Sequence, residues 1–257
     1  RRQRQMCIRD SRDGGQSDFL LLLVLDHKNK TIRQLQIDRD TMTSVNVLGL
    51  FGNNAGSRVM QICLSHGYGM DRQERCQNSL RAVEGLLNCP EIELYMEVPL
   101  DAISTLNDLL GGVTVTLEDD FTSADPAMTK GATLTLTGEQ AVTLVRRRMD
   151  VADGTNETRM TRQREFMDAA VPLIREKINE SSGFITTMID TLTPYVTTNM
   201  VRGRMINEIN RAYHYEVEPV QYLSGEHSIG EDGFVEFHAD KQSIVDFVLD
   251  AFYTKKE

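Results

Sequence analysis

Arginines suited to binding an anion gather in one segment of this chain. The runs Val145–Arg148 and Arg159–Arg164 together hold six arginines within 19 positions. A guanidinium stays charged, and its planar fork matches the oxygens of a phosphate. A solvated basic helix face is the alternative interpretation. Because the whole chain carries a formal net charge of -10, so dense a group indicates a site for a strongly anionic ligand.

The spacing of these residues predicts which of their side chains point the same way. Arg159, Arg162 and Gln163 stand at i, i+3 and i+4 of a predicted helix, and so lie on one face. Arg146 and Arg148 are two apart, so they point the same way only where the chain is extended, as we expect just past a helix end. The two stretches would then aim four arginines and an amide at one volume, which suits a diphosphate.

Two carboxylates are predicted to meet at the end of a β-hairpin. Residues 19–25 have the composition of a buried strand, and residues 31–37 alternate like a half-exposed one. With a tight turn between them, positions that sum to about 57 face each other, which puts Asp18 across from Arg39 and Asp40. Paired carboxylates suit Mg²⁺, and one beside a bound phosphate can act as a general base. A salt-bridged hairpin end without a ligand is the alternative.

Predicted strands and helices are mixed along the rest of the chain. Residues 41–57, which are rich in Gly and Asn towards their end, are expected to form a loop. Thr137 and Gln140 stand at capping-box spacing, at the start of a helix. The mixture favours one α/β domain over residues 18–257, preceded by a polar lead-in at 1–17. Further strands are expected at 93–98, 113–117, 132–136, 215–223 and 234–237, and helices at 73–88, 101–110, 139–146, 156–179, 183–192, 200–211 and 240–253.

Composition and motif content argue against several classes of protein. The acidic balance argues against general nucleic-acid binding. There is no GxxxxGK[ST] loop and no strand-linked GxGxxG, which disfavours an intracellular nucleotide-binding domain. No run reaches the ~18–20 apolar residues that span a membrane. The chain starts in a polar segment without an initiating Met, which is typical of a truncated sequence that has lost either a membrane anchor or a signal.

The four cysteines, Cys7, Cys63, Cys76 and Cys89, have no CxxC spacing, which argues against a zinc site. Cys76 and Cys89 flank a predicted helix of about 20 Å. That separation is too large for a disulfide. We therefore expect the cysteines to be mostly free and buried.

Six motifs follow one another in a fixed order between about residues 17 and 167, and together they resemble the LytR-CpsA-Psr family. The resemblance implies one α/β domain with a central mixed, twisted sheet flanked by helices, and an apolar lipid tunnel between sheet and helices. The motifs are Ser17-Asp18 before an apolar strand, Ile37–Thr41, Leu109–Val113, Thr137–Ala141, Val145–Arg148 and Arg159-x-x-Arg162-Gln163.

The resemblance also implies an activity and roles for particular residues. The activity is transfer of an anionic glycopolymer, of teichoic acid or capsular polysaccharide type, from a polyprenyl-diphosphate-linked donor to a peptidoglycan sugar hydroxyl. Asp18 and Asp40 would hold Mg²⁺, with Mn²⁺ as the alternative, and Arg39 and Asp40 would act in catalysis. The implied diphosphate-binding set is Arg39, Arg146, Arg148, Arg159, Arg162 and Gln163, with Arg162 the less certain contact. The family further implies a single-pass membrane protein of a Gram-positive-type bacterium, with its catalytic domain outside the cell and no nucleic-acid partner.

Three positions depart from the family's pattern. Asp38 stands where the family usually has Pro before Arg-Asp. Gln61 stands where a basic residue is usual, and this change removes an expected phosphate contact. Asn156 stands where an Asp usually precedes the arginine motif, and Asp153 is close enough to replace it.

These departures keep two alternatives to transfer open. One is hydrolysis of the polyprenyl diphosphate with water as acceptor, the reaction of a pyrophosphatase. The other is a non-catalytic module that binds a lipid diphosphate. Arg58 and His66 are the candidates for binding phosphate in place of a basic residue at position 61, although a lone His is more often structural.

Overall fold

The computed structural model describes residues 2–9, 15–49, 52–89, 91–148 and 151–253, with backbone alone for 2–9. These residues form two compact units, and each is described by itself. Unit 1 takes its residues from Arg1–Val98, Thr197–Val201 and His214–Glu257, and unit 2 from Pro99–Val196 and Arg202–Tyr213. The prediction of one domain from residue 18 onward stays a prediction.

The elements of unit 1 are strands β1 (Arg2–Arg9), β2 (Ser17–Asp26), β3 (Thr31–Ile37), β4 (Met42–Leu48), β5 (Asn54–Gln61), β6 (Leu94–Pro99), β9 (Thr197–Thr198), β10 (Glu216–Tyr222), β11 (Gly225–Ile229) and β12 (Val235–Ala239), the 3-10 helix η1 (Ile62–Gly67), and helices α1 (Arg72–Leu87) and α7 (Lys241–Phe252). Those of unit 2 are α2 (Leu100–Leu110), β7 (Thr114–Thr116), β8 (Thr133–Thr135), α3 (Gly138–Arg146), α4 (Asn156–Glu180), α5 (Phe184–Leu192) and α6 (Arg202–Ala212).

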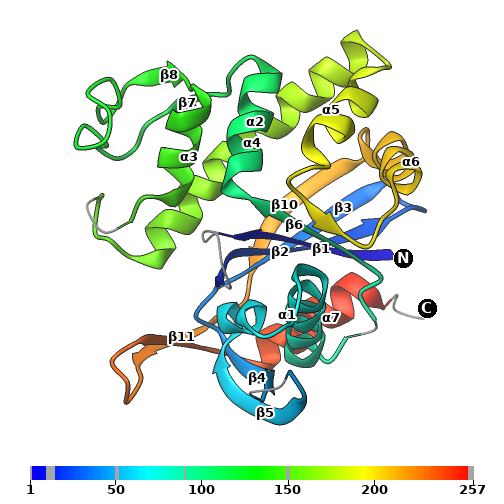
Figure 1. Ribbon diagram of the computed structural model, residues 1–257, viewed down its shortest axis with the longest axis vertical. Coiled ribbons are helices and arrows are strands. Elements are labelled where there is room, and N and C mark those ends of the chain that lie inside the picture. The colour runs from blue at the N-terminus through cyan, green and yellow to red at the C-terminus, as the bar shows by residue number, and fades with distance from the viewer. Residues whose placement is uncertain (1, 10–14, 50–51, 90, 149–150, 254–257) are drawn as a thin grey trace. The chain divides into compact units, whose positions relative to one another are not determined.

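A mixed sheet organises unit 1. Its strand order is β10-β3-β2-β1-β6-β9. β10 runs parallel to β3, whereas β2 is antiparallel to both β3 and β1. Figure 1 shows these strands lying side by side, with α1 and α7 of the same unit beside each other. The predicted α/β class with a mixed sheet and flanking helices is confirmed.

The sheet is buried on both faces at β2. Successive side chains of a strand point to opposite faces. On one face, Leu20, Leu22 and Leu35 are fully buried and join a core to which α1 and α7 also contribute. On the other face, Phe19 and Leu21 are buried as well. Burial of each of these side chains contributes about 1.5–3 kcal/mol, so β2 is firmly held and can position residues at its ends.

The β2–β3 hairpin has the register expected from the sequence. Leu20 pairs with Ile37 and Leu22 with Leu35, and each pair of positions sums to about 57, as predicted. Asp26 stabilises the turn, because its Oδ1 accepts the backbone N–H of Lys28 at 3.0 Å. The hairpin therefore brings the start of β2 next to the residues that follow β3.

The prediction of a loop at residues 41–57 was wrong. These residues form most of the antiparallel β4–β5 hairpin. Thr43, Val45 and Val47 are buried, with more exposed residues between them. That alternation is the strand signal. The Gly- and Asn-rich stretch is confined to the turn of the hairpin and the first residues of β5.

The prediction that the first 17 residues are only a polar lead-in was also wrong. Residues 2–9 form β1, which pairs antiparallel with β2 from Arg2 opposite Leu25 to Ile8 opposite Phe19. A strand buried on both faces, such as β2, needs a neighbour on each side to satisfy its backbone groups. The strand character of residues 2–9 depends on this long-range pairing more than on their own polar composition.

Unit 2 is mainly helical, and its local predictions are confirmed. Gly111 ends α2 with φ 83°, a conformation that favours glycine. Thr137 and Gln140 form the predicted capping box at the start of α3, with each side chain accepting the other's backbone N–H. Among the described helices, none is both long enough and apolar enough to cross a membrane.

Candidate functional site

Arg39 lies against two carboxylates in unit 1, as the hairpin register predicted. Its Nη1 is 2.6 Å from Oδ1 of Asp18, and its Nε is 3.6 Å from Oδ1 of Asp40. Asp18 is 8% exposed and Asp40 is 7% exposed. Carboxylate oxygens are the ligands that hard cations prefer. This acidic cluster, Asp18, Arg39 and Asp40, can therefore accept a cation.

The turn that carries Arg39 and Asp40 is shaped by Asp38. Oδ1 of Asp38 accepts the backbone N–H of Asp40 at 2.9 Å, and its carbonyl oxygen accepts the Thr41 hydroxyl at 2.6 Å. A side chain that bonds the backbone two residues on forms an Asx turn. Asp38 thus stiffens the chain where the family usually has Pro, and its Oδ2 also lies 3.1 Å from Nε2 of His227.

Gln61 contacts the acidic cluster from the end of β5. Its Nε2 donates to Oδ1 of Asp40 at 3.2 Å and to the carbonyl of Val235 at 2.6 Å. The amide therefore orients Asp40 without adding a positive charge. Of the two candidates for compensation, Arg58 is exposed on β5, whereas His66 is fully buried. His66 is not placed to contact a phosphate.

Cys63 completes the surroundings of Arg39. Nη2 of Arg39 donates to Sγ of Cys63 at 3.2 Å. Burial raises the pKa of the Cys63 thiol to about 11, although Arg39 works in the opposite direction. Cys63 is therefore a neutral thiol near pH 7. The described cysteines, Cys63, Cys76 and Cys89, are free as expected, and the side chain of Cys7 lies outside the described part.

In unit 2, Arg162 and Gln163 bind the chain around the end of α3. Nη2 of Arg162 donates to the carbonyl of Arg147 at 2.7 Å, and Nε2 of Gln163 donates to the carbonyl of Val145 at 3.1 Å. The last carbonyls of a helix lack partners within the helix, and a cation is favourable there. Both side chains thus hold the three-arginine run in place.

Arg162 is enclosed by groups of unit 2. It is 2% exposed, and its guanidinium carbon lies 5.2 Å from the centre of the Phe121 ring. Burial lowers the pKa of Arg162, with Asp119 opposing the shift. Nη1 of Arg162 and Oε1 of Gln163 have no hydrogen-bond partner in the described chain. Of these two buried atoms, the Nη1 of Arg162 can donate to an anion, whereas the Oε1 of Gln163 can only accept.

Arg159 is held by the residue that departs from the family's pattern. Its Nη2 donates to Oδ1 of Asn156 at 2.8 Å, so Asn156 orients the guanidinium without neutralising it. Asp153, the alternative carboxylate, accepts from the hydroxyl of Thr158 at 2.7 Å and from the backbone N–H of Thr155 at 3.0 Å. Asp153 thus supports the start of α4.

The chain is extended past α3, as predicted for the arginine run. α3 ends at Arg146, and the following Arg147 has φ −62° and ψ 138°. Arg146 is exposed and Arg148 is half-buried. Nη1 of Arg147 donates to the hydroxyl of Ser123 at 3.0 Å, which ties the run to the loop before β8.

Sequence reasoning missed Glu165 as a candidate functional residue. It lies on α4, and burial together with the charges of Glu118 and Asp119 raises its pKa to about 7. A carboxyl group that titrates near neutrality is typical of functional sites. The acidic run Glu118–Asp120 just after β7 was the available signal, but its approach to α4 depends on tertiary packing.

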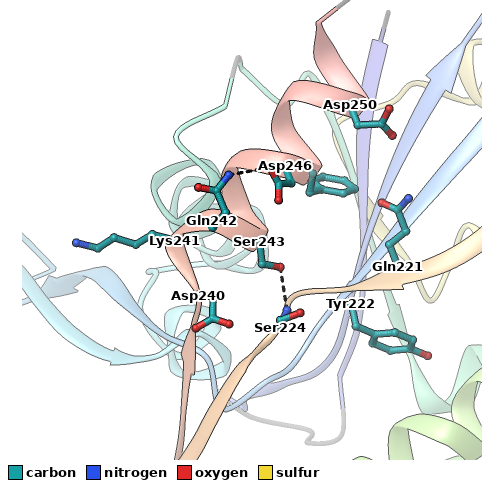
Figure 2. Close-up of a pocket in the computed structure, with 10 residues that line it drawn as sticks. Gln221, Tyr222, Ser224, Asp240, Lys241, Gln242, Ser243, Asp246 and Asp250 are labelled. Carbon is teal, nitrogen blue, oxygen red and sulfur yellow. Dashed lines mark hydrogen bonds between the residues drawn. The ribbon is translucent and has the colours of Figure 1, made fainter.

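Two cavities of the described residues lie away from this set. One of about 800 Å³ lies between β10 and α7, where Gln242 bonds Asp246 and Ser243 bonds the backbone of Ser224 (Figure 2). Another of about 680 Å³ lies along α4 near Pro172. The predicted site residues line neither cavity, so the apolar lipid tunnel stays a prediction.

The chain is an α/β protein. Its mixed sheet carries a buried carboxylate–arginine cluster, and its helical unit carries an arginine segment. The chain belongs to the LytR_cpsA_psr family, whose model matches residues 3–248. It is 29% identical over 198 residues to the "Polyisoprenyl-teichoic acid--peptidoglycan teichoic acid transferase TagU" of Bacillus mycoides (strain KBAB4), an alignment that covers 76% of this chain and 58% of the relative. A TagU of Bacillus anthracis matches to the same extent. The chain thus spans 58% of the length of these curated relatives.

Solved structures share the fold. Protein gbs0355 from Streptococcus agalactiae has a TM-score of 0.80 and 19% identity, covering 100% of this chain and 90% of that one. TagT bound to LI-WTA has a TM-score of 0.74 and 22% identity, covering 97% and 88%. TagV of B. subtilis has a TM-score of 0.73 and 21% identity, covering 99% of each chain.

Proposed function

We propose that this chain transfers an anionic glycopolymer from a polyprenyl-diphosphate-linked donor to a sugar hydroxyl of peptidoglycan. Membership of the LytR_cpsA_psr family supports the reaction class, as does the transferase activity that the TagU relatives are named for. The observation that carries the proposal is the buried cluster in which Arg39 lies against Asp18 and Asp40. The same proposal places the chain outside the cell, attached to the membrane by an anchor.

The acidic cluster fits Mg²⁺, with Mn²⁺ as the alternative. Asp18 and Asp40 offer hard carboxylate oxygens beside each other. Mg²⁺ is usually held by one or two carboxylates together with substrate phosphates and waters. The chemistry that it supplies when bound is neutralisation of charge on phosphate oxygens.

Asp40 and Arg39 are the catalytic residues in this proposal. A carboxylate near the phosphate can take the proton of an acceptor hydroxyl as the hydroxyl oxygen attacks the glycan-bound phosphorus. The bond from that phosphorus to the bridging oxygen then breaks, and polyprenyl phosphate leaves. Gln61 donates to Oδ1 of Asp40, which orients the carboxylate for that role. Arg39 stabilises negative charge on phosphate oxygens by charge-assisted hydrogen bonds.

The arginine segment of unit 2 is assigned to the donor's diphosphate. Arg159 is oriented by a neutral amide, so this partner leaves the attraction of the guanidinium for an anion intact. Arg162 and Gln163 hold the backbone of the run, and the Nη1 of Arg162 is a further donor. With Arg39, the proposed diphosphate-binding set is Arg146, Arg148, Arg159, Arg162 and Gln163.

The site assignment is tested by turnover of a synthetic lipid-diphosphate donor with a peptidoglycan acceptor. Asp40→Asn and Arg148→Ala should each lower kcat/KM by at least 100-fold, because oriented charge is typically worth 10²–10³ in rate, or about 2.7–4 kcal/mol. Arg175→Ala, on the distant part of α4, serves as the control. Turnover like that of the wild type in both site variants would refute the assignment.

A further inference from the structure

Three metal-ligating side chains meet inside unit 1, outside the acidic cluster. They are His66 on η1, Cys76 on α1 and Glu97 on β6. His66 and Glu97 are 0% exposed, and Cys76 is 5% exposed. One ligand atom from each lies within 4.8 Å of the others. The proposed transfer reaction uses none of them.

Two of the separations between these ligand atoms match those in the coordination shell of a zinc ion. Nε2 of His66 is 3.3 Å from Oε1 of Glu97, and Sγ of Cys76 is 3.6 Å from Oε2 of Glu97. Tetrahedral zinc, with bonds of about 2.0–2.1 Å to N and O and about 2.3 Å to S, separates its ligand atoms by roughly 3.3–3.6 Å. One oxygen of Glu97 therefore faces each of the other two ligands, as a carboxylate binding through both oxygens would require.

Hydrogen bonds already link the groups around this cluster. The Ser65 hydroxyl donates to the carbonyl of Ile62 at 2.6 Å and to the Ser79 hydroxyl at 3.1 Å. Further polar contacts join Ser79 to His66, and join both His66 and Cys76 to Glu97. A metal ion bound here would replace the two contacts of Glu97 by bonds from all three side chains to the ion.

Ser79 contacts the ring nitrogen of His66 that does not face Glu97. Its hydroxyl lies 3.4 Å from Nδ1 of His66 and 3.1 Å from the hydroxyl of Ser65. If Nδ1–H donates to Ser79, the neutral ring presents the lone pair of Nε2 towards Glu97. Histidines that bind metal are commonly oriented through their other nitrogen in this way.

The charges around Glu97 suit a cation as well. Nε of Arg72 lies 3.5 Å from Oε2 of Glu97, but the Arg72 side chain is 46% exposed. Arg72 can therefore turn to water when a metal takes its place beside the carboxylate.

We propose that His66, Cys76 and Glu97 form a structural zinc site, with Nε2, Sγ and both carboxylate oxygens as ligands. Binding forms a Zn–S bond and releases the thiol proton of Cys76 to solvent. The site would overturn the expectation, drawn from cysteine spacing, that zinc is absent. The spacing of residues in the sequence does not reveal this site, because the three ligands come from three separate elements.

The site would also support the acidic cluster. η1 carries both His66 and Cys63, and Cys63 accepts a hydrogen bond from Arg39. Zinc would link η1 to α1 and β6. It would thereby stabilise the position of η1, whose Cys63 contacts Arg39. The expected consequence is a folded state whose thermal midpoint rises with zinc.

Metal titration of the whole chain tests this proposal. After chelation and dialysis, Co²⁺ should give a thiolate-to-metal charge-transfer absorption at one equivalent, and Zn²⁺ should abolish it by displacement. Cys76→Ser should lose the absorption and bind zinc at least 100-fold more weakly. Cys89→Ser, which changes a free thiol beyond the end of α1, should keep both. An absorption that is missing from the wild type, or that survives in Cys76→Ser, would overturn the site.

Two further measurements keep the test decisive if Cys76→Ser does not fold. Ser79→Ala leaves all three ligands in place but removes the group that orients His66, and should weaken zinc binding 10–100-fold, as loss of such partners typically does. For the wild type, zinc should raise the thermal midpoint and an equal concentration of Mg²⁺ should not. Unchanged zinc affinity in Ser79→Ala, or equal effects of the two ions, would contradict the proposal.

Discussion

Arg162 donates from Nη2 to the carbonyl oxygen of Arg147 at 2.7 Å. One arginine of the charged segment thus holds the backbone of another. The carbonyl lies just past the end of α3, where a helix leaves such groups without partners. Part of the arginine density in this sequence therefore serves to build the segment.

Replacing Arg162 should destabilise the fold. Arg162→Ala leaves the buried carbonyl of Arg147 without its donor, and a hydrogen bond from a charged group is worth about 1.5–3 kcal/mol. We expect a fall of that size in the free energy of unfolding, measured by urea denaturation. Arg164→Ala is the matched control, because its partner Asp168 is 60% exposed and such a pair contributes about 0.3–0.5 kcal/mol. Equal losses in the two variants would contradict the structural role of Arg162.

Stability should depend on pH through Glu165. Its pKa in the folded chain is about 7 against an ordinary value of 4.5, so the folded state favours the protonated form. The stability contributed by that proton is present below pH 4.5 and is lost as the pH rises through 7. Glu165→Gln should therefore be more stable than the wild type at pH 8 and close to it at pH 4.5. Thermal melts at the two pH values measure this, and a stabilisation that is larger at the lower pH would rule this dependence out.

Asp38 should matter through its shape rather than its charge. Asp38→Ala removes the Asx turn and should lower the free energy of unfolding by about 0.5–1.5 kcal/mol, the value of a typical hydrogen bond. Donor turnover should fall with it, because the turn carries Arg39 and Asp40. Asp38→Asn can form the same turn, and should retain most of both properties. Equal loss in Asp38→Asn and Asp38→Ala would instead point to the charge of Asp38.

The thiol of Cys63 should be slow to react in the native protein. Its pKa of about 11 lies above the ordinary thiol value of 9.0, and only the thiolate is nucleophilic, so ionisation alone slows alkylation at pH 8 by about 100-fold. Iodoacetamide labelling followed by peptide mass spectrometry should find Cys63 protected in the folded chain and modified in urea. Labelling at similar rates in both states would show that Arg39 activates the thiol.

The sequence predicted what local rules control. Asp18 and Arg39 meet because one hairpin register aligns them, and that register follows from two adjacent strands and a short turn. Thr137 and Gln140 form a capping box because the two residues are three positions apart. In each case the interaction lies within a short stretch of chain.

Long-range pairing was beyond these rules. Residues 2–9 have the composition of a polar lead-in, and their strand structure comes from antiparallel pairing with β2. Glu165 acquires its raised pKa from burial and from Glu118 and Asp119, which are far from it in the sequence. In the sequence, Asp38 stood out only as a residue in the place of the usual Pro. The hydrogen bond by which its side chain stiffens the turn is visible only in the structure. Such features depend on which elements pack together, and periodicity does not determine that.

The fate of a labelled glycan phosphate tests the central claim most directly. A synthetic polyprenyl-diphosphate donor is incubated with the chain and Mg²⁺, with and without a peptidoglycan acceptor, and the products are separated by mass. We predict that the label becomes attached to the acceptor sugar by a phosphodiester, with little release when the acceptor is left out. Release of free glycan phosphate without acceptor, at a rate no slower than transfer, would contradict transfer and identify a hydrolase.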